Sequence, residues 1–181
     1  LAEIMSRPIG QKTDTEPLTK VEYYQLLTHL AGWHRLLFEL LWETGIRIGE
    51  AMTIERKHLH DNGIDITREK RKDHLVEFIP LTGSLYSRLR IHALGHKDVR
   101  VFPYTAAAAW LALKKAAERS GVRKTMHPHL FRHGMGFRAR QDGADIAEVQ
   151  RLLGHKDMSS TQRYFKATQA EINERRARLN R

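Results

Sequence analysis

The sequence predicts an α+β domain that is mainly helical and carries a small antiparallel sheet in its first half. Most of its apolar periodicity has the spacing of amphipathic helices rather than of strands. Only two short stretches, Ile64–Arg68 and Leu75–Pro80, have strand character, and they flank a charged tip at residues 69–73. The turn residues Asp61–Gly63 precede the first of them, and no internal repeat is visible.

Capping signals place the helices along the chain. Thr19 and Glu22 have the spacing of a capping box, in which each residue's side chain accepts a hydrogen bond from the other's backbone amide. The pairs Asp145/Glu148 and Thr168/Glu171 repeat this pattern, and we expect Gly45 to end a helix in the left-handed conformation. We expect helices over about residues 19–31, 33–44, 48–53, 84–93, 106–119, 130–141, 146–153 and 170–179.

The chain is long enough for one compact domain, because it has 181 residues, of which 41% are hydrophobic. No apolar run approaches the length that spans a bilayer, and no secretory leader is visible, so we expect no membrane insertion. Lys and Arg number 31 against 21 Asp and Glu, which gives a net charge of +10. A field of this sign favours a nucleic-acid partner over a basic protein with no acidic partner.

The chain contains no cysteine, which excludes disulfides, thiolate nucleophiles and cysteine-based zinc sites and fits a reducing cytoplasm. Residues 1–16 are polar, contain Pro8 and Gly10 and show no period, so they are typical of a tether. The chain begins with Leu1 rather than Met, and we therefore expect a domain, residues 17–181, cut from a longer protein.

Two basic features precede the middle of the chain. Arg47 follows an apolar helix and a glycine turn, at the start of a new helix, where its guanidinium would suit a phosphate oxygen. The competing interpretation is a surface ion pair with Glu50. Lys70, Arg71 and Lys72 at the hairpin tip are either solvated charges or the source of a proton donor for a leaving oxygen.

A histidine-rich segment covers His127–His133. His129, Arg132 and His133 fall on one helical face by their spacing. Zinc is the alternative ligand, but the zincin pattern needs Glu after the first His, where Leu130 stands, and no Cys or carboxylate lies near in sequence. We therefore favour His and Arg converging on one phosphate.

A last segment joins Gly154, His155 and Tyr164. Gly154 ends a predicted helix, so His155 projects from a turn. Tyr164 on its own has the character of an ordinary amphipathic core residue.

Together and in order, these features resemble the tyrosine recombinase (phage integrase) family. The match extends from about Thr19 to Thr168. The matching parts are the first-arginine box at Thr44–Glu50, the His-x-Leu-Arg-His box at His129–His133 with Phe131 in place of Leu, the Leu-Leu-Gly-His box at Leu152–His155, and Tyr164 at the nucleophile position.

The resemblance has two departures. Lys166 stands two residues after Tyr164, where the family often has His. The catalytic lysine is Lys72 when counted back from Ile79–Leu81, whereas a longer turn would favour Lys70, and we adopt Lys72.

The resemblance implies the DNA breaking-rejoining enzyme fold and attack of Tyr164 on a DNA phosphodiester, leaving a 3′-phosphotyrosine and a free 5′-hydroxyl. It implies no metal, ATP or other cofactor, because the adduct holds the phosphoryl bond until rejoining. The roles that it implies are phosphate clamping by Arg47 and Arg132, protonation of the leaving oxygen by Lys72, deprotonation of Tyr164 by His129, and a hydrogen bond to the phosphate from His155.

The family also implies double-stranded DNA as partner, a homotetramer on paired sites and a missing N-terminal DNA-binding domain before the tether. The segment from Ala170 docks on a neighbouring subunit, folds back on its own domain or frays in solution. DNA recombination or integration by a mobile genetic element, in the cytoplasm at a bacterial nucleoid or in a phage-infected host, would be the setting. The alternatives are a type IB topoisomerase and a non-catalytic DNA-binding module of the same fold.

Overall fold

The fold was obtained as a computed structural model, which describes residues 17–68, 76–155, 159–162, 164–165 and 178. Its elements are α1 (Lys20–Thr28), α2 (Gly32–Thr44), α3 (Ile48–Met52), the 3-10 turn η1 (Arg56–His58), β1 (Leu59–His60), β2 (Gly63–Thr67), β3 (Val76–Pro80), α4 (Gly83–Leu94), α5 (Ala106–Ser120), α6 (His129–Gln141), α7 (Ile146–Leu153) and α8 (Ser159–Gln162). The predicted class, mainly helical with a small antiparallel sheet, is confirmed.

Two capping boxes begin the helices that the sequence predicted. The Thr19 hydroxyl accepts from the Glu22 amide at 3.2 Å, and the Glu22 carboxylate accepts from the Thr19 amide at 2.8 Å. Asp145 and Glu148 make the same reciprocal pair at the start of α7, with both distances 2.8 Å. These side chains satisfy amides that have no partner inside the helix, which is why the helices begin where they do.

Glycines in the left-handed region set two boundaries around α2. Gly45 ends α2 with a φ of 65°, as predicted. Gly32 has a φ of 53° and opens α2 after a short turn. The first helix, α1, ends at Thr28 rather than near Ala31 as predicted, and residues 29–31 form the turn before α2.

The sheet has the order β1-β2-β3 and both pairings are antiparallel. The predicted hairpin is present in β2 and β3, where Ile64 pairs with Ile79. Ile64 and Ile66 point to the buried side. The extra strand β1 has two residues, which is too short to give a periodic signal in the sequence. The predicted charged tip lies outside the described residues.

One large apolar core holds most of the domain together, and α2 runs through it. Leu37, Leu40 and Leu41 are fully buried, and Phe38 stacks on Phe131 of α6 with ring centroids 5.0 Å apart. Because α2 packs against α4, α5 and α6, its sequence is apolar on most sides.

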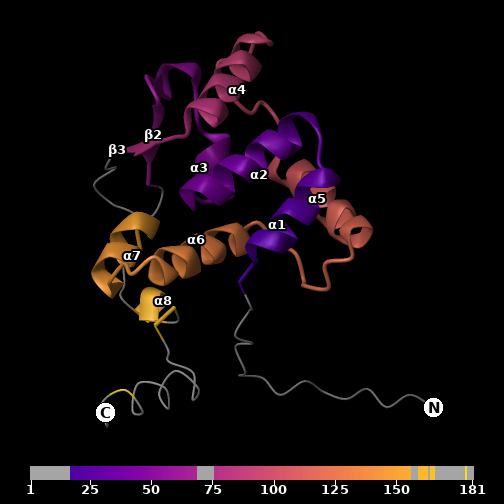
Figure 1. Cartoon of the computed structure of the whole chain (residues 1–181). Coiled ribbons are helices and arrows are strands. Elements are labelled where there is room, and N and C mark those ends of the chain that lie inside the picture. The colour runs from indigo at the N-terminus through magenta and orange to yellow at the C-terminus, as the bar shows by residue number, and fades with distance from the viewer. Residues whose placement is uncertain (1–16, 69–75, 156–158, 163, 166–177, 179–181) are drawn as a thin grey trace, which may run out of the picture.

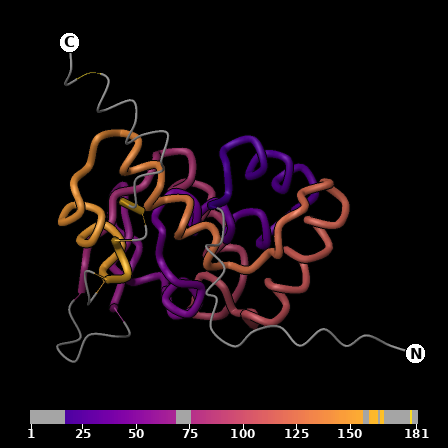
Figure 2. The backbone as a smooth tube through the Cα atoms, turned by 90° about the horizontal axis from the view of Figure 1, so that it is seen from below, coloured from indigo at the N-terminus to yellow at the C-terminus, as the bar shows by residue number. Residues whose placement is uncertain are grey.

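A second, smaller cluster lies at the other end of α6. It consists of Ala139, Val149, Leu153 and Tyr164. Figure 1 shows α6 running along the lower part of the molecule toward α7 and α8, away from α1 and α5. In Figure 2 the orange and yellow trace of α7 and α8 again lies at the end opposite α1 and α5.

The ends of the chain are described only in part. The tether predicted at residues 1–16, the predicted helix at 170–179 and the Thr168/Glu171 capping box lie outside the described residues. The short helix α8 was not predicted, because its four residues carry no apolar period. None of the helices in the described ranges has the length and apolar character needed to cross a membrane.

Candidate active site

Arg47 is held at the turn between α2 and α3. Its backbone amide donates to the Glu50 carboxylate at 2.7 Å, and its Nη1 donates to the other carboxylate oxygen at 2.8 Å. Glu50 is fully buried, whereas the Arg47 side chain keeps 17% of its surface exposed. The Arg47–Glu50 ion pair, one of the two interpretations of the sequence, is therefore present. It orients the Arg47 guanidinium, which remains partly exposed to solvent.

Arg132 joins two turns that come from opposite ends of the chain. It lies on α6 and is only 1% exposed. Its Nη1 donates to the Gly45 carbonyl at 2.7 Å, and its Nη2 donates to the Leu153 carbonyl. Arg132 therefore ties the turn that precedes Arg47 to the turn that precedes His155.

The charge environment of Arg132 is unusual. Burial is the main cause that lowers the pKa of Arg132 to about 10, and the nearby positive charge of Arg47 lowers it further. The guanidinium remains protonated at neutral pH. Its Nε has no hydrogen-bond partner in the described part of the chain. An anion bound here would offset the cost of burying this cation.

The turn after α7 presents His155. Gly154 ends the helix with a φ of 57°, and the His155 amide donates to the Gln150 carbonyl at 3.0 Å. The His155 Nδ1 lies 2.9 Å from the Thr161 hydroxyl of α8. The predicted projection of His155 from a turn is confirmed.

Tyr164 is buried, with 1% of its surface exposed, and its hydroxyl lies 2.7 Å from Nδ1 of His133. Its ring is nearly parallel to that of His155, with an interplanar angle of 10° and centroids 6.3 Å apart. Phe137 meets the ring edge-on at 5.7 Å. The phenol is therefore fixed between α6 and the turn after α7.

Gly136 makes room for the tyrosine. A Cβ on Gly136 would lie 2.8 Å from two ring carbons of Tyr164. Gly136 follows His129, Arg132 and His133 on the same face of α6, because helical neighbours recur at three- and four-residue steps. A glycine inside a helix destabilises it, and here the close approach of the ring explains its presence.

The structure brings most of the predicted site residues close together around Arg132. Arg47 and Tyr164 both lie within electrostatic reach of Arg132, and the His129 ring lies edge-on to that of His133 with centroids 5.4 Å apart. Lys72 and the alternative Lys70 lie outside the described residues.

Three further residues were not among the predicted site residues. His133 contacts the Tyr164 hydroxyl, Gly136 admits its ring, and Arg68 lies buried against Glu50. The signal for His133 was its position on the same helix face as His129. The signal for Arg68 was its place two residues after Ile66, directly beyond a strand whose alternate residues Ile64 and Ile66 are buried.

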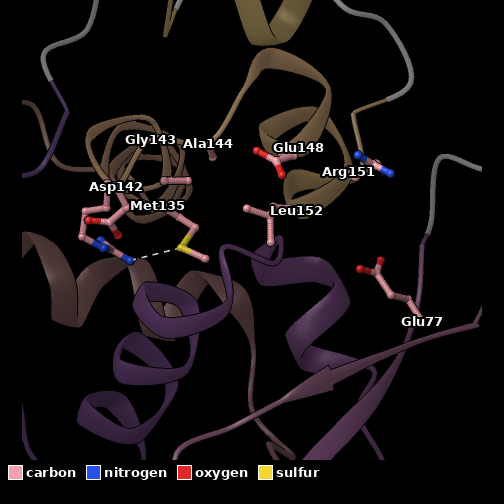
Figure 3. A pocket seen from close by; sticks show the side chains of 10 residues that line it. Glu77, Met135, Asp142, Gly143, Ala144, Glu148, Arg151 and Leu152 are labelled. Carbon is pink, nitrogen blue, oxygen red and sulfur yellow. Dashed lines mark hydrogen bonds between the residues drawn. The ribbon is translucent and has the colours of Figure 1, made fainter.

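A hollow of about 860 Å³ lies beside this site, between β3, α6 and α7. Figure 3 shows Glu148, Arg151 and Leu152 on its α7 side, with Asp142 and Glu77 on two other sides. Within the described ranges, no group of three or more His, Asp or Glu side chains is placed to hold a metal ion.

Comparisons with known proteins agree with this arrangement. Tyrosine recombinase XerD of Lacticaseibacillus casei is 32% identical over 143 residues, which are 72% of this chain and 49% of that protein. XerD of Corynebacterium glutamicum is 32% identical over 153 residues, 77% of this chain and 50% of that protein. The chain thus spans about half the length of these relatives.

Solved structures share the fold. The integrase of transposon Tn1549, solved with transposon right end DNA, superposes with a TM-score of 0.75 at 20% identity, over 92% of this chain and 66% of that one. XerA recombinase gives a TM-score of 0.72 at 17% identity, over 92% and 65%.

The sequence pattern of the phage integrase family matches residues 16–171, which include Arg47, the α6 histidines, His155 and Tyr164. This range covers most of the chain, and the chain therefore belongs to the phage integrase family.

Proposed function

We propose that this chain is the catalytic domain of a site-specific recombinase that cleaves and rejoins double-stranded DNA through a 3′-phosphotyrosine at Tyr164. The observation that carries the proposal is the 2.7 Å contact between the Tyr164 hydroxyl and His133 beside the buried Arg132. The named relatives are tyrosine recombinases, and the net charge of +10 suits a DNA partner.

The two arginines bind the phosphate. Arg47, in the turn before α3, and Arg132, on α6, contribute fork-shaped donors, and the charge that builds on the non-bridging oxygens in the transition state strengthens both contacts. His155 donates a further hydrogen bond to the phosphate. Loss of one such preorganised donor typically costs about 3–4 kcal/mol in the barrier.

The protons balance through two groups. The Tyr164 oxygen attacks phosphorus, the bond to the 5′-oxygen breaks, and Lys72 protonates that oxygen as it leaves. The Tyr164 proton passes to Nδ1 of His133, which is the nitrogen within hydrogen-bond distance of the hydroxyl. His129 was the residue predicted for this step. Its ring lies edge-on to that of His133, and we assign it to the phosphate beside Arg132.

Covalent trapping tests the proposal. A duplex nicked next to the cleavage position loses the short 5′-hydroxyl fragment, so a phosphotyrosine adduct accumulates. Tyr164→Phe is expected to bind DNA as the unmodified protein does and to form no adduct, because the diffuse basic surface supplies most of the affinity. An adduct that survives in this variant overturns the assignment of the nucleophile.

The proton acceptor is tested in the same assay. His133→Ala is expected to slow adduct formation more than His129→Ala does at pH 7, and the difference should shrink as the pH approaches about 10, the ordinary pKa of a tyrosine. A larger loss in His129→Ala would return the step to His129.

Two other functions are outcomes of further assays. Relaxation of supercoiled DNA by monomers, without a recombination site, would favour a type IB topoisomerase. DNA binding with no adduct in the unmodified protein would favour a non-catalytic module.

We propose that the working assembly is a homotetramer on two paired DNA sites, in the cytoplasm where the DNA lies. The hollow in Figure 3 is lined by three carboxylates, from Glu77, Asp142 and Glu148, and by Arg138 and Arg151, beside the exposed Leu152. The segment 170–181 carries apolar residues, four arginines and two glutamates. We propose that it docks in this hollow on a neighbouring subunit. Removal of residues 170–181 is expected to leave single-site adduct formation intact and to abolish strand exchange between two duplexes.

A further inference from the structure

Arg68 is a buried arginine that the reaction described above does not use. It follows β2 directly and is 1% exposed. Its Nε donates to the Glu77 carboxylate at 2.7 Å, while Nη1 lies 3.4 Å from the Glu50 carboxylate and Nη2 lies 3.5 Å from the Leu152 carbonyl. Burial of a guanidinium costs free energy unless the charge is paired, and Glu77 and Glu50 supply this pairing for Arg68.

Glu50 is shared between two arginines. One of its oxygens accepts from Arg47 Nη1, and the other accepts from the Arg47 amide and faces Nη1 of Arg68. The Glu50 side chain has no exposed surface, so solvent does not screen it. Without Arg68, the Glu50 charge would be balanced by Arg47 alone.

The charges of the cluster fit one phosphate. Three cations, Arg47, Arg68 and Arg132, face two carboxylates, Glu50 and Glu77, which leaves one positive charge among these residues. A phosphodiester carries one negative charge, and the transition state carries more. Removal of Arg68 would leave this set with no net positive charge.

The turn at Gly154 is shaped around the same guanidinium. A Cβ on Gly154 would lie 2.9 Å from Nε and 3.1 Å from Cζ of Arg68. Together with the contact to the Leu152 carbonyl, this places Arg68 against the turn that carries His155. The Arg68 guanidinium therefore contacts both Glu50, the ion-pair partner of Arg47, and the turn that carries His155.

We propose that Arg68 is a positioning residue of the phosphate site, where it neutralises Glu50 and so leaves the charge of Arg47 available to the scissile phosphate. This proposal rests on the proposed function. It differs from a purely structural role because it predicts a defect that depends on the charge of the substrate.

The test compares two nicked duplexes with the full chain. One carries the natural phosphate, and in the other a methyl group replaces one non-bridging oxygen, which removes the negative charge of the ground state. Arg68→Gln keeps hydrogen-bonding capacity and loses the cation. It should slow adduct formation on the phosphate by about tenfold or more, with DNA affinity unchanged, and by less than about threefold on the neutral substrate.

Two variants complete the test. Arg68→Lys keeps the charge and should retain at least about a third of the rate on both substrates, and this comparison stands even where Arg68→Gln does not fold. Arg56→Met removes a partly buried arginine that donates to the His96 carbonyl away from the site, and it should change neither rate.

Equal losses on both substrates in Arg68→Gln would overturn the proposal and leave Arg68 a structural residue. A loss of more than about threefold in Arg68→Lys on the phosphate substrate would also overturn it, because this variant keeps the cation. Absence of any adduct in the unmodified protein would instead refute the proposed function, so the two failures are distinguishable.

Discussion

The two ends of α6 lie in very different surroundings. Its first half packs into the large core through Leu130 and Phe131, both fully buried against elements from the first half of the chain. In its second half, Ala139 belongs to a small cluster, in which it and Tyr164 pack with two side chains of α7. Fewer apolar contacts mean a lower free energy of local opening.

This difference divides the proposed chemistry. Arg47 follows Ile46 of the large core, and Arg132 bridges the two regions through the Gly45 and Leu153 carbonyls, whereas the nucleophile Tyr164 lies in the small cluster. Tyr164 is 1% exposed, so its hydroxyl must be uncovered before it reaches DNA. We infer that the small cluster opens while the large core stays closed, and five variants, taken from the largest expected effect to the smallest, test that division.

Phe131→Ala should have the largest effect. The ring is fully buried and packs on Phe38, Tyr23 and Trp42, so its removal should lower the free energy of unfolding by about 3–5 kcal/mol. Urea unfolding measures this, and Ile91→Ala, at a position 71% exposed, is the control with a change within about 0.5 kcal/mol. A loss below about 1 kcal/mol for Phe131→Ala would contradict the account.

Val149→Ala should be smaller and local. Val149 is fully buried in the small cluster, and loss of two methyl groups should cost about 1–2 kcal/mol. Hydrogen exchange should become faster in the amides of α7, while the amides of α2 keep their rates. Equal acceleration in both helices would mean that the two ends of α6 open together.

Gly136→Ala separates activity from stability. Alanine favours the helix by up to about 1 kcal/mol, but its Cβ would press on the Tyr164 ring. Adduct formation should fall by about tenfold or more, with little change in the urea midpoint. Gly83→Ala in α4, where a Cβ meets nothing within 4 Å, is the matched control. An unchanged rate in Gly136→Ala would show that the ring position does not matter.

Substitutions in the two capping boxes should have the smallest effects, and they form a matched pair with one variant in each region. Asp145→Ala and Thr19→Ala should each cost about 1 kcal/mol, because each removes the acceptor of an otherwise unpaired amide. Hydrogen exchange should rise in α7 for Asp145→Ala, with no change in α1. A rise in α1 for this variant would show that the two regions are coupled.

The sequence was most informative where local chemistry decides the structure. The caps at Thr19 and Asp145 and the stop at Gly45 were predictable because side chain and backbone interact within a few residues. The strand β1 was missed because it has two residues and forms only through its pairing with β2.

The site was predictable as a set of residues rather than as a set of contacts. Arg132 was expected near a phosphate, but its bonds to the Gly45 and Leu153 carbonyls depend on packing between distant segments. The approach of Tyr164 to His133 likewise needs the space at Gly136, which no local pattern reveals. Lys72 stays a prediction.

The most direct test of the central claim is the chemical identity of the adduct. The full-length protein is incubated with a pool of nicked duplexes, the covalent complex is digested, and the nucleotide-bearing peptide is identified by mass spectrometry. We expect one modified peptide, with a 3′-phosphonucleotide on the oxygen of Tyr164. Attachment to another residue, or no adduct on any duplex while DNA binding is retained, would contradict the account.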